Sequence, residues 1–315
     1  MPAWNDLLRE FDQQADDVAR GAWLEHRLTQ ALSGVSARRS GRNVIFYASA
    51  FLQKPGAPPP SLQLTHEEIN GFMSVMYGMD WSKDLTLILH TPGGVTNAAE
   101  TVVAYLWSKF KFIEVIVPAF AMSAGTMMAL GSNRVVLGRQ SQLGPIDPQL
   151  PVLGRFVSGR AVVEQFERAK QEILQNLATA HVWAPILQSL GPSLVQEAQN
   201  AIDYGELMVR GWLSQRMFAT IENSAQKAAH VAKHFNDASR HKSHGRRIDR
   251  NEAAAQGVIV EELEADQQLQ EEVLTAYHLV TMLFEKSPAS KLLASNAGSR
   301  WLKNLSVVRP GGQVS

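Results

Sequence analysis

The segment 64–137 alternates short apolar runs with helical patterns, and this alternation limits the possible folds more than any other feature of the chain. Residues 85–90 and 113–117 are apolar runs with the length of buried strands. Each is followed by residues with helical spacing, at 97–110 and at 123–131. Strands that alternate with helices in this way build a mainly parallel sheet covered by helices. We therefore predict an α/β fold.

Helical patterns flank this segment on both sides. Apolar side chains recur at helical spacing in residues 1–35, and we also predict helices over 264–284 and 290–305. The run 44–51 predicts a further strand. The predicted division of the chain is an N-terminal helical arm (1–40), a core domain (41–263) and a C-terminal helical extension (264–315). The flanking helices are expected to dock on the core or on a neighbouring subunit.

Two turns follow neighbouring predicted strands and carry the residues of a candidate active site. Pro92-Gly93-Gly94 ends the first strand, and glycine lets backbone N–H groups approach a ligand closely. Ser123 follows the next strand at the start of a short helix, and the N–H of Ala124 comes directly after it. The carboxyl ends of parallel strands meet at one edge of a sheet, where ligands bind. The pair of turns predicts a serine nucleophile with an oxyanion hole formed by the amides of Gly93 or Gly94 and Ala124.

Composition excludes several other kinds of chemistry. The 315 residues include no cysteine, so thiol nucleophiles, disulfides and Cys-ligated metals are impossible. The 30 basic residues balance 30 acidic ones, which argues against a protein that coats nucleic acid or an anionic membrane. A basic cluster between Arg240 and Arg250 is interpreted as a solvated loop. The N-terminus lacks the pattern of a secretory signal, and the apolar stretch 115–130 is too short to span a bilayer. We expect a cytoplasmic protein.

Three motifs together resemble one known family. HTPGG at 90–94, MSAGT at 122–126 and LGPIDPQ at 143–149 are similar to the serine dehydrogenase proteinase family of the Clp protease and crotonase superfamily. The resemblance extends over about 44–262, where the element 248–259 is similar to the end of the superfamily's core. It implies a ClpP/crotonase-like spiral of parallel strands and helices, a serine peptidase that forms an acyl-enzyme on Ser123, and a homo-oligomer. Peptide or protein substrates follow from this resemblance.

The base that activates the serine is a separate question. In the Clp protease subunit it is a histidine after the serine, and the corresponding stretch here, GPIDPQ, has none. Signal peptide peptidase A and the NfeD-type membrane proteases use a lysine on a later helix, which favours Lys170. Its apolar neighbours at helical spacing predict partial burial, which would lower its pKa. The alternative is that Lys170 extends toward solvent from the edge of this apolar stripe and pairs with Glu167. His181 is the competing base, and Asp147 is a candidate for orienting a base or the substrate.

No cofactor or metal is expected from the sequence. His230 and His234 have the spacing of metal ligands on a helix, but they lack an evident third ligand and lie near the basic loop. Phosphate-binding glycine motifs are absent from the chain, so energy-dependent unfolding would need a separate ATPase partner. Two alternative functions stay open. One is a crotonase-like acyl-CoA hydratase or thioesterase, and the other is a catalytically silent oligomeric scaffold.

Overall fold

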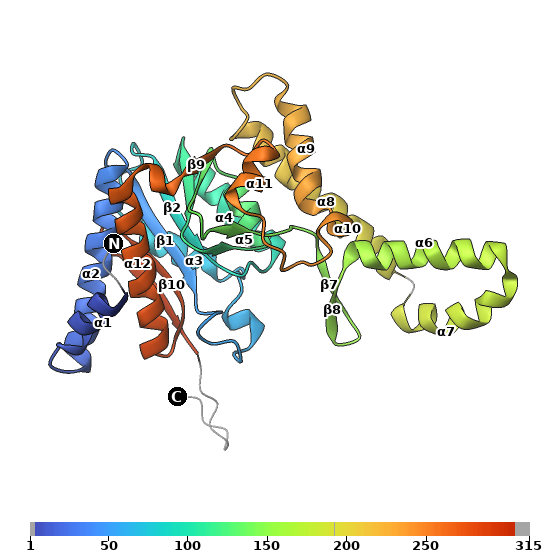
Figure 1. The fold of residues 1–315 in the computed structure, drawn as a ribbon, viewed down its shortest axis with the longest axis horizontal. Helices are drawn as coiled ribbons and strands as arrows, with labels where there is room; N and C mark the ends of the chain where they lie inside the picture. The colour runs from blue at the N-terminus through green and yellow to red at the C-terminus, as the bar shows by residue number, and fades with distance from the viewer. Residues whose placement is uncertain (1–3, 192, 306–315) are drawn as a thin grey trace, which may run out of the picture. The chain divides into compact units, whose positions relative to one another are not determined.

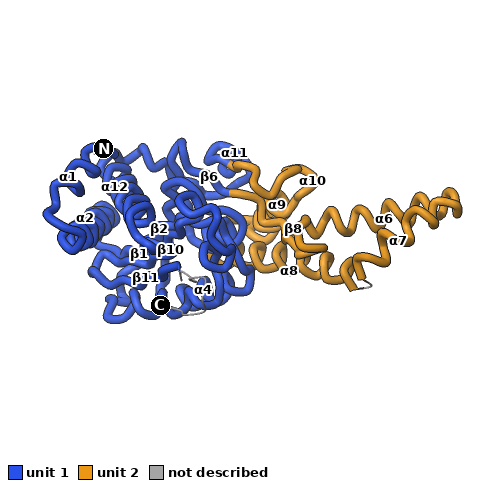
Figure 2. Tube along the Cα trace, turned by 90° about the horizontal axis from the view of Figure 1, so that it is seen from below, with its two compact units in different colours: residues 1–143, 249–315 blue, residues 144–248 orange. Residues whose placement is uncertain are grey.

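The computed structural model describes residues 4–191 and 193–305. The chain forms two compact units, one made of residues 1–143 and 249–315 and the other of residues 144–248 (Figure 2). This division differs from the predicted arm, core and extension. Both terminal regions belong to the first unit because their helices pack on its sheet, and residues 306–315 of the predicted extension lie outside the described part.

A mixed sheet of seven strands forms the first unit (Figure 1). In spatial order the strands are β11 (Arg300–Asn304), β10 (Ala289–Ser295), β1 (Asn43–Ser49), β2 (Leu85–His90), β3 (Ile113–Val117), β5 (Arg134–Leu137) and β9 (Val260–Glu262). The five from β1 to β9 pair in parallel, and β10 and β11 add an antiparallel edge. A short parallel pair, β4 (Phe120–Ala121) and β6 (Gln142–Leu143), lies beside this sheet. The predicted α/β fold with a parallel central sheet is confirmed.

The predicted helix over 290–305 is wrong, because this segment is the β10–β11 hairpin. Every residue of β10 is buried, and the strand pairs with β1 along five residue positions. A short apolar run is ambiguous between helix and strand in its periodicity. Pairing with an exposed edge of β1 decides the conformation, since it satisfies the backbone hydrogen bonds of both strands.

Helices cover both faces of the sheet. One face carries α1 (Trp4–Asp12), α2 (Asp17–Arg38) and α12 (Gln267–Lys286), and the other carries α3 (Glu68–Met76), α4 (Thr96–Lys109) and α5 (Ala124–Leu130). Alternation along β1 sends Phe46 and Ala48 into the α2–α12 core and turns Tyr47 to the opposite face. A short helix, α11 (Arg250–Ala255), precedes β9. The predicted helices near 1–35 and 264–284 are confirmed.

The second unit is mostly helical. It contains the hairpin β7 (Gln149–Val152) and β8 (Arg155–Ser158) and the helices α6 (Gly159–Gln175), α7 (Ala180–Leu190), α8 (Leu194–Gln215), α9 (Ser224–Asn236) and α10 (Ala238–His241). The predicted helix over 159–190 breaks at Asn176 instead of near Pro185, which lies inside α7. The Asn176 side chain accepts a hydrogen bond from the N–H of Ala178 and so caps the next turn.

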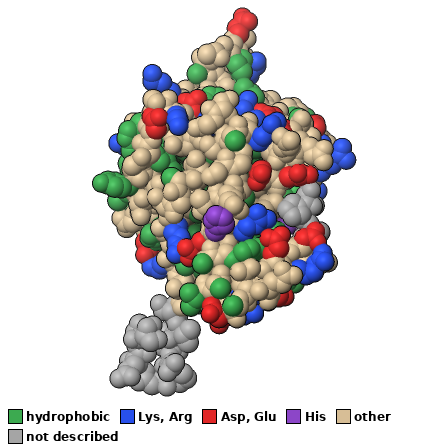
Figure 3. Space-filling model, turned by 90° about the vertical axis from the view of Figure 1, so that its left-hand side faces the viewer, with side chains coloured by type: hydrophobic (Ala, Val, Ile, Leu, Met, Phe, Trp, Pro, Cys, Tyr) green, Lys and Arg blue, Asp and Glu red, His purple; other side chains and the backbone are tan. Residues whose placement is uncertain are grey.

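The surface carries both signs of charge. On the face drawn in Figure 3, basic and acidic side chains are interspersed. Among the residues that the structure describes, no helix combines the length and the apolar character needed to cross a bilayer.

A fully buried carboxylate in the middle of the sheet contacts side chains from several elements of the first unit. Glu114 on β3 lies 2.8 Å from Arg134, 3.1 Å from Arg39 and 3.1 Å from Arg42, measured between nitrogen and oxygen. It also accepts a hydrogen bond of 2.7 Å from the Thr86 hydroxyl. A buried carboxylate with several partners stabilises a fold only as long as those partners are kept.

We predict that Glu114→Gln lowers the free energy of unfolding by about 3 kcal/mol, because three guanidinium groups lose the fully buried carboxylate that they share and keep only the more exposed Glu261 and Asp84 as partners. Equilibrium urea unfolding measures the change. The matched control is Glu25→Gln, because Glu25 pairs with Arg300 with both side chains about half exposed (50% and 49%). The control is expected to have little effect. Equal effects of the two variants would contradict a special role for Glu114.

Candidate active site

The glycine turn after β2 has a backbone that only glycine adopts without strain. Gly93 has φ +93° and Gly94 has φ +153°. A Cβ atom on Gly93 would lie 2.5 Å from the carbonyl oxygen of Met122, and one on Gly94 would lie 2.2 Å from that of Leu64. Both contacts are with backbone, which has little freedom to move away. The two glycines are therefore required by the close approach of neighbouring chain segments.

Ser123 lies in a strained turn at the entrance of α5. Its φ and ψ angles are +50° and −118°, a conformation that a residue with a side chain rarely adopts. The N–H of Gly125 donates to the carbonyl oxygen of Met122 at 2.8 Å and closes the turn around Ser123. Such strain costs of the order of 1–3 kcal/mol and is common at active sites. Ser123 is partly exposed.

Backbone hydrogen bonds bring the two turns together, as the sequence predicted. Thr91 donates its N–H to Phe120 at 2.9 Å and accepts the N–H of Met122 at 3.0 Å. As a result, a Cβ atom on Gly93 would lie 2.7 Å from the Cβ of Ser123 and 2.9 Å from the nitrogen of Ala124. Gly93, Ser123 and Ala124 are thus immediate neighbours at one edge of the sheet.

The backbone amides at these turns are not equivalent. Gly93 donates its N–H to the Thr91 hydroxyl at 3.1 Å. Within residues 4–191 and 193–305, the N–H groups of Gly94 and Ala124 have no hydrogen-bond acceptor. Two free amides beside a partly exposed serine hydroxyl are the elements of an oxyanion hole.

A histidine–aspartate pair lies in the second unit. The Oδ1 atom of Asp147 is 2.8 Å from Nδ1 of His244, and Oδ2 accepts a hydrogen bond of 2.7 Å from Gln149. Asp147 is buried, whereas the His244 side chain is 29% exposed and lines a cavity of about 350 Å³. The carboxylate fixes the ring with Nδ1–H as donor, which leaves Nε2 as the basic nitrogen. Sequence reasoning singled out Asp147 but placed His244 in the basic loop, because no local motif links residues so far apart in the chain.

The predicted partial burial of Lys170 is wrong. Its side chain is 66% exposed, and its Nζ lies 3.6 Å from a carboxylate oxygen of Glu167. The helix α6 turns Val162 and Ala169 toward the protein instead, and Lys170 follows Ala169 by one position, about 100° around the axis. The partial burial that favoured Lys170 as the base is therefore not found. His181, the competing base, is also exposed, and no residue of α7 is buried.

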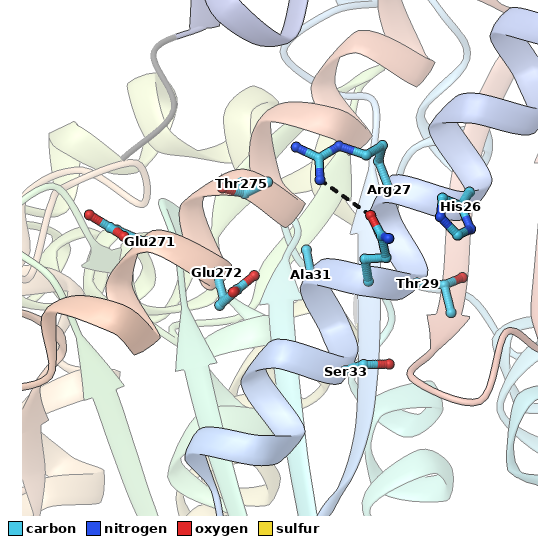
Figure 4. A pocket seen from close by; sticks show the side chains of 9 residues that line it. His26, Arg27, Thr29, Ala31, Ser33, Glu271, Glu272 and Thr275 are labelled. Atoms are coloured by element: carbon cyan, nitrogen blue, oxygen red, sulfur yellow. Dashed lines mark hydrogen bonds between the residues drawn. The ribbon is translucent and has the colours of Figure 1, made fainter. Parts of the chain in front are cut away.

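A separate pocket lies between α2 and α12 (Figure 4). It has a volume of about 580 Å³, and its polar lining includes Arg27, which donates a hydrogen bond to Gln30, and Glu272, whose pKa is raised by burial. Neither Ser123 nor the glycine turn lines it. In the described part of the chain, no three His, Asp or Glu side chains are grouped so as to hold a metal ion.

His90, the first residue of the HTPGG motif, is a core residue. It is 2% exposed, and its ring centroid lies 4.9 Å from that of Tyr277, 5.0 Å from Phe51 and 5.9 Å from Phe120. Among the described residues, neither ring nitrogen has a hydrogen-bond partner. Burial lowers the pKa of His90 to about 3, so the ring is neutral near pH 7.

Comparison with known proteins identifies the family of the segment that holds these turns. Residues 74–179 match the sequence model of the ClpP-like SDH-type serine proteinases. This match agrees with the family that the motifs resemble, and it includes the glycine turn, Ser123 and Lys170.

Individual relatives match only short parts of the chain. Two uncharacterized proteins of Methanocaldococcus jannaschii are 36% identical over 87 residues and 30% identical over 89 residues. Each match covers 28% of this chain, and the chain spans less than a third of these curated relatives, 30% and 29% of their lengths. Among solved structures, a mutant of the 1510-N membrane-bound stomatin-specific protease is similar, with 18% identity and a TM-score of 0.37. That alignment covers 67% of this chain and 79% of the other.

We predict that His90 makes the protein sensitive to acid. In the unfolded chain a histidine takes up a proton below about pH 6.5, but native His90 stays neutral down to about pH 3. Stability is therefore lost as the pH falls through this window, by about 2–3 kcal/mol between pH 7 and pH 4.5. His90→Phe removes this part of the pH dependence in urea unfolding. The exposed His66 gives the control His66→Gln, whose profile should follow that of the wild type.

Proposed function

Because residues 74–179 match the sequence model of the ClpP-like SDH-type serine proteinases, we propose that this chain is a peptidase that uses Ser123 as its nucleophile. The observation that carries the proposal is the strained, partly exposed Ser123 beside the free N–H groups of Gly94 and Ala124. A strained serine that serves no purpose in packing is expected to be replaced by glycine, which adopts this conformation without cost.

In the proposed reaction the Ser123 hydroxyl oxygen attacks the carbonyl carbon of a peptide bond as a base removes its proton. The N–H groups of Gly94 and Ala124 stabilise the negative charge that develops on the carbonyl oxygen. The C–N bond then breaks, and the amine leaves with a proton. Water hydrolyses the resulting acyl-enzyme and regenerates the serine. Gly93 contributes by its lack of a side chain, since its own N–H is bonded to Thr91.

Three side chains are candidates for the base: Lys170, His181 and His244. We favour His244, because the buried carboxylate of Asp147 orients its ring and leaves Nε2 as the nitrogen that can accept a proton. Lys170, which the sequence favoured, is exposed and paired with Glu167.

We predict that a fluorophosphonate probe labels the wild-type chain on Ser123. Ser123→Ala should abolish labelling, whereas Ser108→Ala, which changes an exposed serine, should leave it intact. Peptide mass analysis identifies the modified residue. Persistent labelling of Ser123→Ala would exclude Ser123 as the nucleophile.

The same assay distinguishes the bases. His244→Ala is expected to slow labelling by about a hundredfold or more, while Lys170→Ala and His181→Ala should react at nearly the wild-type rate. The reverse pattern, with loss only in Lys170→Ala, would assign the base to the lysine.

We also predict that Ser123→Gly stabilises the fold while it removes labelling. Glycine adopts φ +50° and ψ −118° without strain, so the free energy of unfolding should rise by about 1 kcal/mol. Ser123→Ala keeps the strain and serves as the control in urea unfolding. A loss of stability in Ser123→Gly relative to Ser123→Ala would contradict the strain argument.

A further inference from the structure

A buried ion pair joins the antiparallel edge of the sheet to the start of α3. Lys291 on β10 is 1% exposed and contacts a carboxylate oxygen of Glu68, which is fully buried. Burial of a charged pair is costly and is tolerated only when the remaining hydrogen-bonding positions are filled. At Glu68 these positions are filled by Thr65 and Tyr47.

The residues Tyr47, Thr65, Glu68 and Lys291 form a largely buried polar cluster that is connected to the glycine turn in two ways. The first connection runs through the backbone. One oxygen of Glu68 accepts both the N–H and the hydroxyl of Thr65, each at 2.7 Å. The preceding residue, Leu64, donates its N–H to Gly93 at 2.8 Å and accepts the N–H of Val95 at 2.9 Å. The Glu68 carboxylate therefore holds Thr65 and, next to it, Leu64, whose backbone is hydrogen-bonded to the residues before and after Gly94.

The second connection between this cluster and the glycine turn runs through side chains. Tyr47, fully buried on β1, donates its hydroxyl to Glu68 at 3.4 Å. Burial and the Glu68 charge raise the pKa of Tyr47 well above its usual value, so the phenol stays protonated. The Thr91 side chain interacts with the Tyr47 hydroxyl and lowers its pKa in part, and the Thr91 hydroxyl oxygen accepts the N–H of Gly93 at 3.1 Å.

Thr91 also holds the serine turn. Its backbone bonds to Phe120 and Met122 on the way to Ser123, and its methyl group would lie 2.5 Å from a Cβ atom on Gly125. Thr91 thus contacts both turns of the candidate site, and its side chain also interacts with Tyr47.

We propose that Thr91, Tyr47 and Glu68 are positioning residues that hold the Gly94 and Ala124 amides in the geometry of an oxyanion hole, with Lys291 as the counter-charge. The inference rests on the proposed function, because it concerns the same site. None of the four is proposed to exchange a proton with the substrate. Their contribution is to reduce the movement of the two turns, which matters most when charge develops on the carbonyl oxygen.

The test uses variants that remove one hydroxyl at nearly constant shape. Tyr47→Phe and Thr91→Val are each expected to slow fluorophosphonate labelling of Ser123, and kcat for a peptide or activated ester, by about tenfold with little change in KM. Because Tyr47 acts partly through Thr91, the double variant should be slower than Thr91→Val by much less than tenfold. The matched control is Thr86→Val, which removes a buried hydroxyl on β2 that donates to Glu114 on β3. It should change stability but not the labelling rate.

Amide hydrogen exchange gives a readout that does not depend on activity. In Tyr47→Phe and Thr91→Val, peptides covering 91–95 and 122–126 should exchange faster than in Thr86→Val. Unchanged exchange and unchanged labelling in both variants would overturn the inference. A wild-type chain that is never labelled on Ser123 would instead reject the proposed function, and the exchange data would still decide whether the cluster holds the turns.

The role of the Glu68–Lys291 ion pair is tested by comparing a variant that lacks one charge with a variant that lacks both. Glu68→Gln alone leaves Lys291 buried without a counter-charge and is expected to destabilise the fold strongly. Glu68→Gln with Lys291→Met removes both charges and should fold, yet exchange at 91–95 should be faster than in the wild type. Wild-type exchange and labelling rates in this folded double variant would contradict a positioning role for Glu68.

Discussion

The candidate site depends on one steric constraint, the close approach of two backbone turns at the carboxyl edge of the sheet. A side chain at Gly93 would overlap the carbonyl oxygen of Met122, and one at Gly94 would overlap Leu64. Parallel pairing of β2 with β3, continued by the bridge from Thr91 to Ala121, sets this approach. The free amides and the serine hydroxyl are neighbours because the backbone can come this close only where glycine is present.

This arrangement stores unfavourable energy that the rest of the first unit must offset. Ser123 is held in a strained conformation, and charged groups are buried at Glu68 and Glu114. Each buried carboxylate lies between elements distant in sequence, and each is surrounded by cations and hydroxyl donors. The apolar core between the sheet and the helices α2 and α12 supplies the stabilisation that makes such costs tolerable.

Features of this fold that depend on neighbouring residues could be predicted from the sequence, whereas features that depend on contacts between distant residues could not. Local patterns were sufficient for the strands at 85–90 and 113–117 and for the two turns that follow them, because periodicity and glycine chemistry act over a few residues. Local patterns failed for 290–305, where pairing with β1 converts an expected helix into a hairpin. They also failed for Lys170, because a shift of one position on a helix separates a buried side chain from an exposed one.

The sequence by itself determined the α/β class, the family resemblance and the identity of Ser123, Gly93, Gly94 and Ala124 as the candidate site. Those conclusions rest on residue types and short spacings, which the chain carries in any conformation. Only the tertiary structure decided that the Gly93 amide is occupied, that Ser123 is strained, and that His244 pairs with Asp147. It also revealed the cluster of Tyr47, Glu68, Thr91 and Lys291 behind the glycine turn. Contacts between residues far apart in the chain exist only after the strands have paired, so no local pattern records them.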